Sequence, residues 1–245
     1  MADLKQGIAN HDQVITNGNY LNADQDKQSA YSDAVNHAQQ IINGTPNAIV
    51  NPQEVTQALQ QVTQTKGELN GDQNLQTAQQ NATTMIDQLS NLNTPQKEAL
   101  KQQVTQAGLV PDVDRVKQTA NDLNTAMGNL KQQLQANSQV PQSIDYTQAD
   151  NSKQVAYDNA TNLAQQIVDG TPTAVLNVED VNQALTNVNQ AKDELNGNEN
   201  LAQAKQEATT QLGTLQDLNQ PQHDALAEQI NQAQSIDAVN QIKQT

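Results

Sequence analysis

The fold is decided by one stretch of the chain, VDRVKQTANDLNTAMGNLKQQL, which runs from Val113 to Leu134. Its apolar side chains recur at alternating steps of three and four residues, at Val113, Val116, Ala120, Leu123, Met127, Leu130 and Leu134. This spacing is that of a heptad seam on one face of an α-helix. It predicts one long helix over residues 112–135, roughly 24 residues or about 36 Å at 1.5 Å per residue.

Four further apolar stripes have helical spacing, and no segment alternates with the period of two that is typical of a strand. The stripes begin near Tyr31, Val55, Leu75 and Leu100, and each one reappears 126 residues later. The sequence therefore predicts an all-α protein.

The chain contains an internal repeat with a period of 126 residues. Residues 20–119 align with residues 146–245 without a gap, and 50 of the 100 aligned positions are identical. The start of the chain aligns with the end of the long helix, so residues 1–14 are predicted to be a helix as well. Repeats in series are typical of architectures in which each unit contacts only its neighbours. We expect just under two units of a longer array.

Capping residues mark the ends of the predicted helices. Asn51-Pro52-Gln53-Glu54 combines a capping Asn with a first-turn Pro and an acidic residue, and Asn177 with Asp180 repeats this box. Thr94-Pro95 is expected to start another helix in the same way. A left-handed residue is expected after the last turn at the glycines that follow apolar stripes, which are Gly44, Gly71, Gly170 and Gly197. Five helices per unit result.

Short loops favour antiparallel neighbours, so the helices are expected to group in threes. The long helix would end one three-helix bundle and open the next, and a continuous helix is stiffer than a Gly/Ser linker. The predicted fold is all-α, an elongated rod of tandem three-helix bundles joined by a long shared helix.

The composition excludes several classes of protein. The 245 residues include 12 Lys and Arg against 27 Asp and Glu, a net charge of −15, and no Cys. Without Cys there are no disulfides, thiolate metal sites or thiol nucleophiles, and the acidic balance is unlike the basic surface that nucleic acid binding requires. No apolar run of about 18 residues is present, so we expect no direct membrane insertion of this segment. The start Met1-Ala2-Asp3 carries no targeting signal.

No catalytic, cofactor or metal site can be assembled from the sequence. The three histidines align with other residue types, His11 with Asn137, His37 with Leu163 and His223 with Lys97. Phosphate-binding, nucleophile-elbow and zincin motifs are absent from the sequence, so we expect that the protein is not an enzyme. His37 is expected to be a half-buried packing residue, because Leu163 is assigned to an apolar helix face.

Four tyrosines are the candidate partner-binding residues. Tyr20, Tyr31, Tyr146 and Tyr157 occupy equivalent positions, two in each copy of the repeat. Tyr is enriched at binding hot spots, which favours an aromatic anchor for a partner. The alternative is that each ring packs at the end of a bundle with its hydroxyl in solvent.

The two halves of each unit resemble two known modules. The segment 20–71, with Tyr31-x-x-Ala34-x-x-x-Ala38-x-x-Ile41 and a closing Leu69-Asn70-Gly71, resembles a FIVAR module. The segment 74–124, with Leu92-Asn93-x-Pro95-Gln96-x-x-Ala99-Leu100, resembles a GA module. Serial FIVAR–GA units of this length are characteristic of the giant staphylococcal extracellular-matrix-binding surface proteins.

This resemblance implies a division of the chain. The expected parts are a FIVAR-like three-helix module over 1–72 with a shortened first helix, a GA-like module over 73–124, a long connecting helix over 112–136 shared by neighbouring modules, a FIVAR-like module over 125–198, and a shortened GA-like module over 199–245.

The resemblance also implies a function. Its family is extracellular and anchored in the cell wall of Gram-positive bacteria. The segment would be an elongated stalk and adhesin for host matrix proteins of the fibronectin type, with a role in cell-envelope integrity or biofilm. The alternative is a structural spacer with no ligand in this segment. In either case we expect no cofactor.

Albumin is not an expected partner. The GA modules that bind albumin carry aromatic residues and a glycine in the loop between their first two helices. The matching stretches, Asn91–Gln96 and Asp217–Gln222, have neither. The charge of −15 disfavours self-association, so a monomer is expected.

The predicted rod can be tested by small-angle scattering of the chain in solution. Bundles that share a helix extend in series, so the radius of gyration should lie well above the roughly 18 Å of a compact chain of this length. A radius of gyration close to that compact value would contradict the shared helix.

Overall fold

The computed structural model describes residues 1–49 and 51–244, and helices make up most of them. Val50 and Thr245, the last residue of the second predicted GA-like module, lie outside the described residues. The described part of the chain contains no strand, which confirms the all-α class.

The elements follow one another along the chain with short connections. In order they are α1 (Ala2–Ile8), α2 (His11–Ile15), α3 (Gly18–Leu21), α4 (Gln25–Asn43), α5 (Pro52–Gly67), α6 (Gly71–Gln88), α7 (Thr94–Gln106), α8 (Val110–Ala136), the 3₁₀ helix η1 (Val140–Gln142), α9 (Ile144–Thr147), α10 (Asn151–Asp169), α11 (Val178–Asp193), α12 (Gly197–Leu212), α13 (Gln220–Gln232) and α14 (Ile236–Ile242).

The chain divides into two compact units. The first comprises residues 1–89 and 97–121, and the second comprises residues 90–96 and 122–245. Helix α8 contributes residues to both units. It is continuous over 27 residues, which confirms the long helix predicted from the heptad seam.

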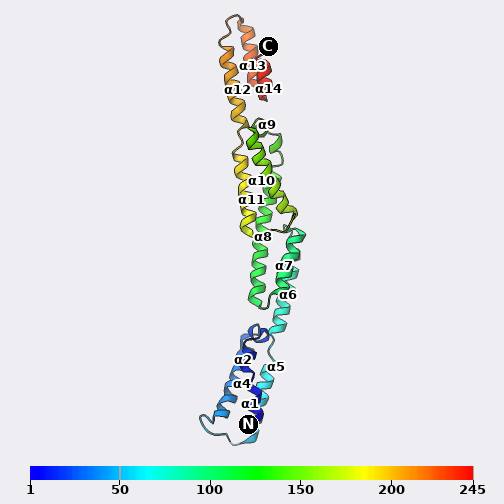
Figure 1. The fold of residues 1–245 in the computed structure, drawn as a ribbon, viewed down its shortest axis with the longest axis vertical. Coiled ribbons are helices and arrows are strands. Elements are labelled where there is room, and N and C mark those ends of the chain that lie inside the picture. Colours follow the sequence, from blue (N-terminus) through cyan, green and yellow to red (C-terminus); the bar gives the residue numbers. More distant parts are fainter. Residues whose placement is uncertain (50, 245) are drawn as a thin grey trace. The chain divides into compact units, whose positions relative to one another are not determined.

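In the first unit, α1, α4 and α5 pack against one another as a three-helix bundle (Figure 1). The core is narrow and consists mostly of Leu, Val, Ile and Ala side chains around the fully buried Tyr31. Helices α6 and α7 follow, and Gln79 of α6 donates from Nε2 to the carbonyl oxygens of Val104 (3.2 Å) and Ala107 (3.1 Å) at the end of α7.

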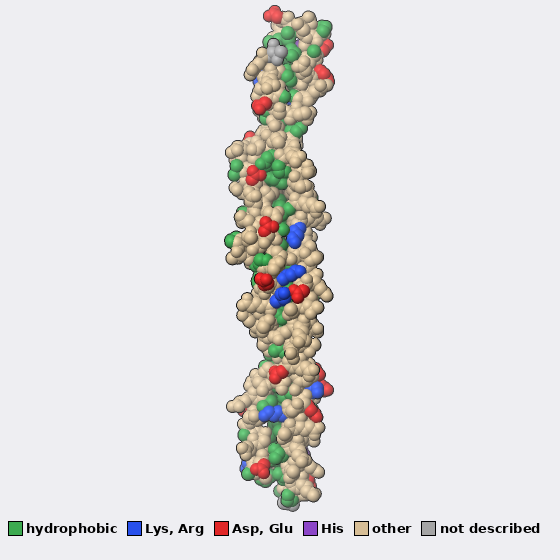
Figure 2. All heavy atoms as spheres, turned by 90° about the vertical axis from the view of Figure 1, so that its right-hand side faces the viewer, with side chains coloured by type: hydrophobic (Ala, Val, Ile, Leu, Met, Phe, Trp, Pro, Cys, Tyr) green, Lys and Arg blue, Asp and Glu red, His purple; other side chains and the backbone are tan. Residues whose placement is uncertain are grey.

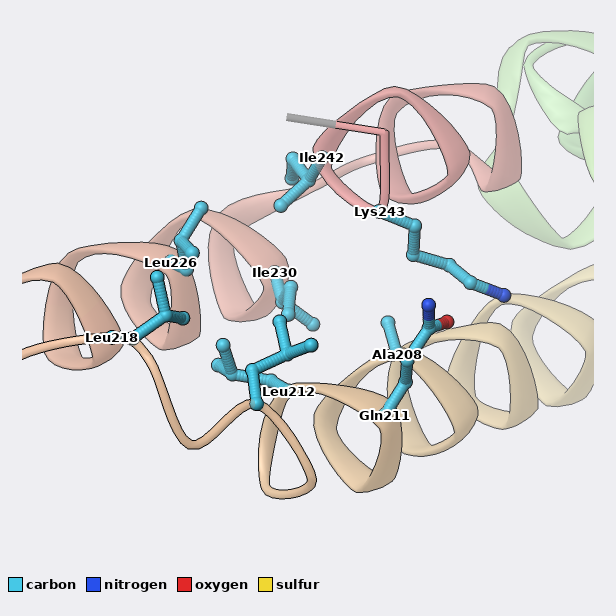
Figure 3. Close-up of a pocket in the computed structure, with 9 residues that line it drawn as sticks. Ala208, Gln211, Leu212, Leu218, Leu226, Ile230, Ile242 and Lys243 are labelled. Atoms are coloured by element: carbon cyan, nitrogen blue, oxygen red, sulfur yellow. The ribbon is translucent and has the colours of Figure 1, made fainter.

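In the second unit, the later part of α8 lies alongside α10 and α11 (Figure 1). Helices α12, α13 and α14 form a further bundle in which each helix contacts the other two. Figure 3 shows Leu212, Leu218, Leu226, Ile230 and Ile242 pointing toward one another between these helices, where they line a cavity of about 120 Å³.

The N-terminal helix is interrupted, which corrects the prediction of one helix over residues 1–14. Helix α1 ends at Ile8, and α2 begins at His11. Asn10, at the break, has φ −102° and ψ 16°, a turn conformation that Asn tolerates well. Helix α8 ends at Ala136, the position equivalent to Asn10, so the helix ends in the same region of both copies of the repeat, two residues later in the second copy. The short helices that follow were not predicted.

The four glycines have two different roles, which corrects half of the C-cap prediction. Gly44 and Gly170 are left-handed, with φ of 69° and 73°, and end α4 and α10 as expected. Gly71 and Gly197 instead begin α6 and α12 with ordinary φ. A Cβ atom at Gly71 would overlap a backbone carbonyl oxygen of the short helix α3, and one at Gly197 would overlap backbone carbonyl oxygens of the short helix α9. These positions require glycine for close approach of two backbones.

Helix α7 is capped one residue earlier than predicted. The Asn93 side chain accepts from Gln96 N (2.9 Å), and the Gln96 side chain accepts from Asn93 N (3.1 Å). Asn219 and Gln222 make the same reciprocal pair at the start of α13. Asn, rather than the Thr94 expected from Thr-Pro, therefore supplies the cap.

The close approach can be tested by substituting Gly71→Ala and, separately, Gly197→Ala. The added methyl group must displace backbone, so each variant should lose about 1–3 kcal/mol of unfolding free energy in urea denaturation followed by circular dichroism. Gly67→Ala is the matched control, because a Cβ atom there meets nothing within 4 Å. It should be neutral or stabilising by up to about 1 kcal/mol. Equal losses in all three variants would contradict the role of close approach.

Candidate functional site

A carboxylate organises the joint between α3 and α6. Asp24 accepts from Asn70 Nδ2 (2.8 Å) and from Asn74 Nδ2 (2.9 Å). Asn74 also donates to the carbonyl oxygen of Asn22 (3.0 Å), and the backbone N–H of Asp24 donates to Asn70 Oδ1 (3.1 Å). The second copy repeats the arrangement with Asp150 at the centre.

Both carboxylates are held in the charged form. The hydrogen bonds from Asn70 and Asn74 lower the pKa of Asp24 below the usual 3.8, and those from Asn196 and Asn200 do the same for Asp150. Donors aimed at a carboxylate stabilise its ionised state. This joint was missed from the sequence, although the Asp and both Asn residues recur at the period of 126.

The four candidate tyrosines form two edge-to-face pairs. The ring centroids of Tyr20 and Tyr31 are 6.1 Å apart, and those of Tyr146 and Tyr157 are 5.8 Å apart. Tyr31 is 0% exposed and Tyr157 3% exposed, whereas the outer ring of each pair is half-buried. Ring surface that a partner could reach therefore belongs to Tyr20 and Tyr146.

The hydroxyls of the outer tyrosines hydrogen-bond to protein side chains. Tyr20 Oη lies 3.0 Å from Ser32 Oγ, and Tyr146 Oη donates to the carboxylate of Asp158 (2.9 Å). This bond raises the pKa of Tyr146. Burial raises the pKa of Tyr31. These contacts make both pairs part of the packing of their bundles.

The structure overturns the expectation for His37 and Leu163. His37 is exposed on α4 and is not half-buried. Leu163, its equivalent on α10, is 59% exposed and faces solvent. The reason is that Leu163 lies next to the buried Ala164 along α10, one position away from the covered helix face.

Leu163 lies in a groove between α10 and α11 that the sequence did not reveal. The groove has a volume of about 360 Å³. Its lining consists of Ala160, Leu163, Gln166, Ile167, Thr171, Pro172, Thr173, Val175, Asp180, Gln183, Ala184 and Asn187. The mismatch between His37 and Leu163 in the repeat alignment was the available signal.

The α6–α7 loop and the first turn of α7 fix one end of this groove. Asn93 donates from Nδ2 to the carbonyl oxygens of Ile167 (3.0 Å) and Val168 (3.2 Å), and Gln96 donates from Nε2 to that of Val175 (2.7 Å). Gln96 is 0% exposed. The two residues that cap α7 thus also bind the segment joining α10 to α11, within the second compact unit.

Charged side chains are sparse on the face shown in Figure 2. Figure 2 shows a face dominated by backbone and by side chains that are neither hydrophobic nor charged, with hydrophobic, acidic and basic groups scattered among them. Across residues 1–49 and 51–244, no cluster of three or more His, Asp or Glu residues could hold a metal ion. In the same residues, no helix is both long and apolar enough to span a membrane.

The joint predicts a specific acid sensitivity. Asp24 and Asp150 have lowered pKa values in the folded chain, so the stability they supply is present at neutral pH and is lost as the pH falls through those values, below 3.8. The double variant Asp24→Asn/Asp150→Asn should have a lower unfolding free energy than wild type in urea denaturation at pH 7. The difference in unfolding free energy between the two proteins should be smaller at pH 3. Asp26→Asn, outside the joint, is the control. A gap of constant size would contradict the role of the two carboxylates.

Family models match the chain along almost its whole length. The FIVAR domain model matches residues 1–70 and 126–196, and the GA module model matches residues 72–126 and 198–245.

Curated relatives and a solved structure agree with these matches. The extracellular matrix-binding protein ebh of Staphylococcus aureus strain NCTC 8325 and EbhA of strain Newman are each 65% identical to the chain over 244 residues. The chain spans only 3% and 7% of their lengths. A crystallised domain of EbhA from Staphylococcus aureus has a TM-score of 0.90 at 36% identity, covering 100% of this chain and 97% of that one. The chain belongs to the FIVAR family, and its two FIVAR domains alternate with GA modules.

Proposed function

We propose that the chain is a repeat segment of a cell-wall-anchored bacterial surface protein that acts as an elongated stalk and as an adhesin for host extracellular matrix, with ligands of the fibronectin type. The observation that carries this proposal is the 65% identity, over the whole chain, to proteins named for matrix binding. The chain is a small part of those proteins, so their ligand is transferred here as a proposal.

The internal construction supports a stalk. The same order of modules occurs twice, and one continuous helix, α8, supplies residues to both compact units. Modules repeated in series add length without a new fold. A weak site present in several modules also gains effective concentration when a ligand offers several epitopes. A role in cell-envelope integrity or biofilm would follow from such an array on the cell surface.

We infer that the segment works by binding and has no enzymatic role. Its curated relatives are named for what they bind, and the geometry offers a groove and half-buried tyrosine rings. Its location would be extracellular, at the bacterial surface.

A pure spacer is the second candidate. The observation in its favour is that the tyrosines are engaged within their own bundles, with two rings buried and hydroxyls bound to Ser32 and Asp158. In this case length and stiffness would be the whole function of the segment.

Surface binding to immobilised fibronectin, with albumin in parallel, separates the two candidates. The adhesin predicts saturable binding to fibronectin with a dissociation constant on the order of micromolar, equivalent to about 8 kcal/mol. Albumin should give none, because the stretches Asn91–Gln96 and Asp217–Gln222 carry neither an aromatic residue nor a glycine. Without saturable binding to fibronectin at micromolar concentration, the spacer would stand and the adhesin would be wrong for this ligand.

A further inference from the structure

We propose that the groove between α10 and α11 is a docking surface for a segment of a matrix protein that carries aliphatic side chains next to Lys or Arg. This inference rests on the proposed function and names the surface that would carry it. The groove belongs to the second FIVAR domain, and the residue that defines it is Leu163.

The groove offers apolar surface that the domain itself leaves uncovered. Leu163 is 59% exposed, and Ile167 and Val175 beside it are half-buried. A ligand that covers these side chains removes apolar area from water, which is the main favourable term in protein association. Gln166, Gln183 and Asn187 add amide groups that can hydrogen-bond a ligand backbone.

The groove is held in shape before any ligand arrives. Ile167 and Val175 line it, and their carbonyl oxygens accept hydrogen bonds from Asn93 of the α6–α7 loop and from Gln96 in the first turn of α7. The buried Gln96 fixes the segment that joins α10 to α11. A preformed groove loses less conformational entropy on binding than a mobile one.

Charge selects the occupant. Asp180 is the single charged residue of the lining, and the chain carries a net charge of −15. A second copy of the chain would bring like charge to the groove and be repelled. A segment with Lys or Arg beside its aliphatic side chains is complementary to Asp180 and to the field of the whole chain.

The internal repeat assigns the site to one copy. Seven of the twelve lining residues are identical at the equivalent positions of the first FIVAR domain. Four more are exchanged for residues of similar polarity, including Asp180 for Glu54 and Val175 for Ile49. The remaining change is Leu163 to His37, an aliphatic side chain to a polar ring. The apolar anchor is therefore specific to the second copy.

Reciprocal exchange at this position tests the inference on the full chain. Leu163→His gives the second copy the residue of the first, and His37→Leu does the reverse. Leu215→His is the matched control, because Leu215 is 49% exposed and lies outside the groove. The probes are fibronectin and a synthetic peptide of alternating leucine and lysine, with a leucine–glutamate peptide as the charge control. Titration calorimetry gives affinity and stoichiometry, and backbone amide shifts locate the peptide.

Leu163→His should weaken binding of both probes by about tenfold, the effect of one modest hot-spot residue. Leu215→His should bind as wild type does. The leucine–lysine peptide should shift the amides of Leu163, Ile167 and Val175, and the leucine–glutamate peptide should not. His37→Leu should leave the stoichiometry of the leucine–lysine peptide at one per chain, because the hydrogen bonds from Asn93 and Gln96 that shape the groove are made to the second FIVAR domain.

The outcomes separate this inference from the proposed function. If fibronectin binds equally to wild type and Leu163→His and the peptide shifts no groove amide, the docking surface is wrong and the adhesin stands. If the peptide binds in the groove with the expected dependence on Leu163 while fibronectin does not bind, the groove chemistry stands and the fibronectin ligand is wrong. A stoichiometry of two per chain in His37→Leu would show that the side chain at this position is sufficient, and would overturn the role of Asn93 and Gln96 in shaping the groove.

Discussion

The structure depends on a close backbone approach at the start of α6 and of α12. Gly71 lies against the backbone of α3 and Gly197 against the backbone of α9, where no Cβ atom fits. No side chain fits between backbones this close, so hydrogen bonds beside the contact hold the two helices together. In the first copy, Asp24 accepts from the side chains of Asn70 and Asn74. Polar side chains thus join a FIVAR domain to the GA module that follows it. This solution suits a chain with only 35% hydrophobic residues.

The same reasoning explains how so polar a sequence folds at all. A three-helix module of about 50–70 residues buries a smaller fraction of its surface than a larger domain does and is marginally stable by itself. The cores are built from Leu, Ile, Val and Ala with one buried tyrosine in each FIVAR domain. Neighbouring modules then stabilise one another, each FIVAR domain and the following GA module through an aspartate joint, and the first GA module and the second FIVAR domain through the hydrogen bonds of Asn93 and Gln96. The abundant Asn and Gln residues therefore have two roles. Some form the hydrogen bonds of these joints, and others cover the surface with polar groups.

The sequence was sufficient for the features that depend on local periodicity. The heptad seam predicted α8, and the glycines after α4 and α10 were correctly assigned as left-handed caps. Spacing along a helix shows which residues share a face, but it does not show what covers that face. For this reason the pattern predicts a cap at Gly71 and a covered face for Leu163, whereas Gly71 begins a helix and Leu163 is open to solvent. The role of Asn93 was missed for the same reason, since its acceptors lie more than 70 residues away.

Comparison of the two copies separates residues that hold the modules together from residues free to change. The joint keeps its chemistry even where the residue changes. The side-chain oxygen of Asn22 accepts a hydrogen bond from the backbone N–H of Val110. Gln148, at the equivalent position, accepts one from the backbone N–H of Ile236. At the groove the backbone and most of the lining are retained, while position 37 or 163 changes from a polar ring to an aliphatic chain. An exposed position carries no penalty of packing, so such a change leaves the fold of the module intact and alters only its surface. In the proposed adhesin, such changes therefore place docking surfaces in some repeat units while every unit keeps the same fold.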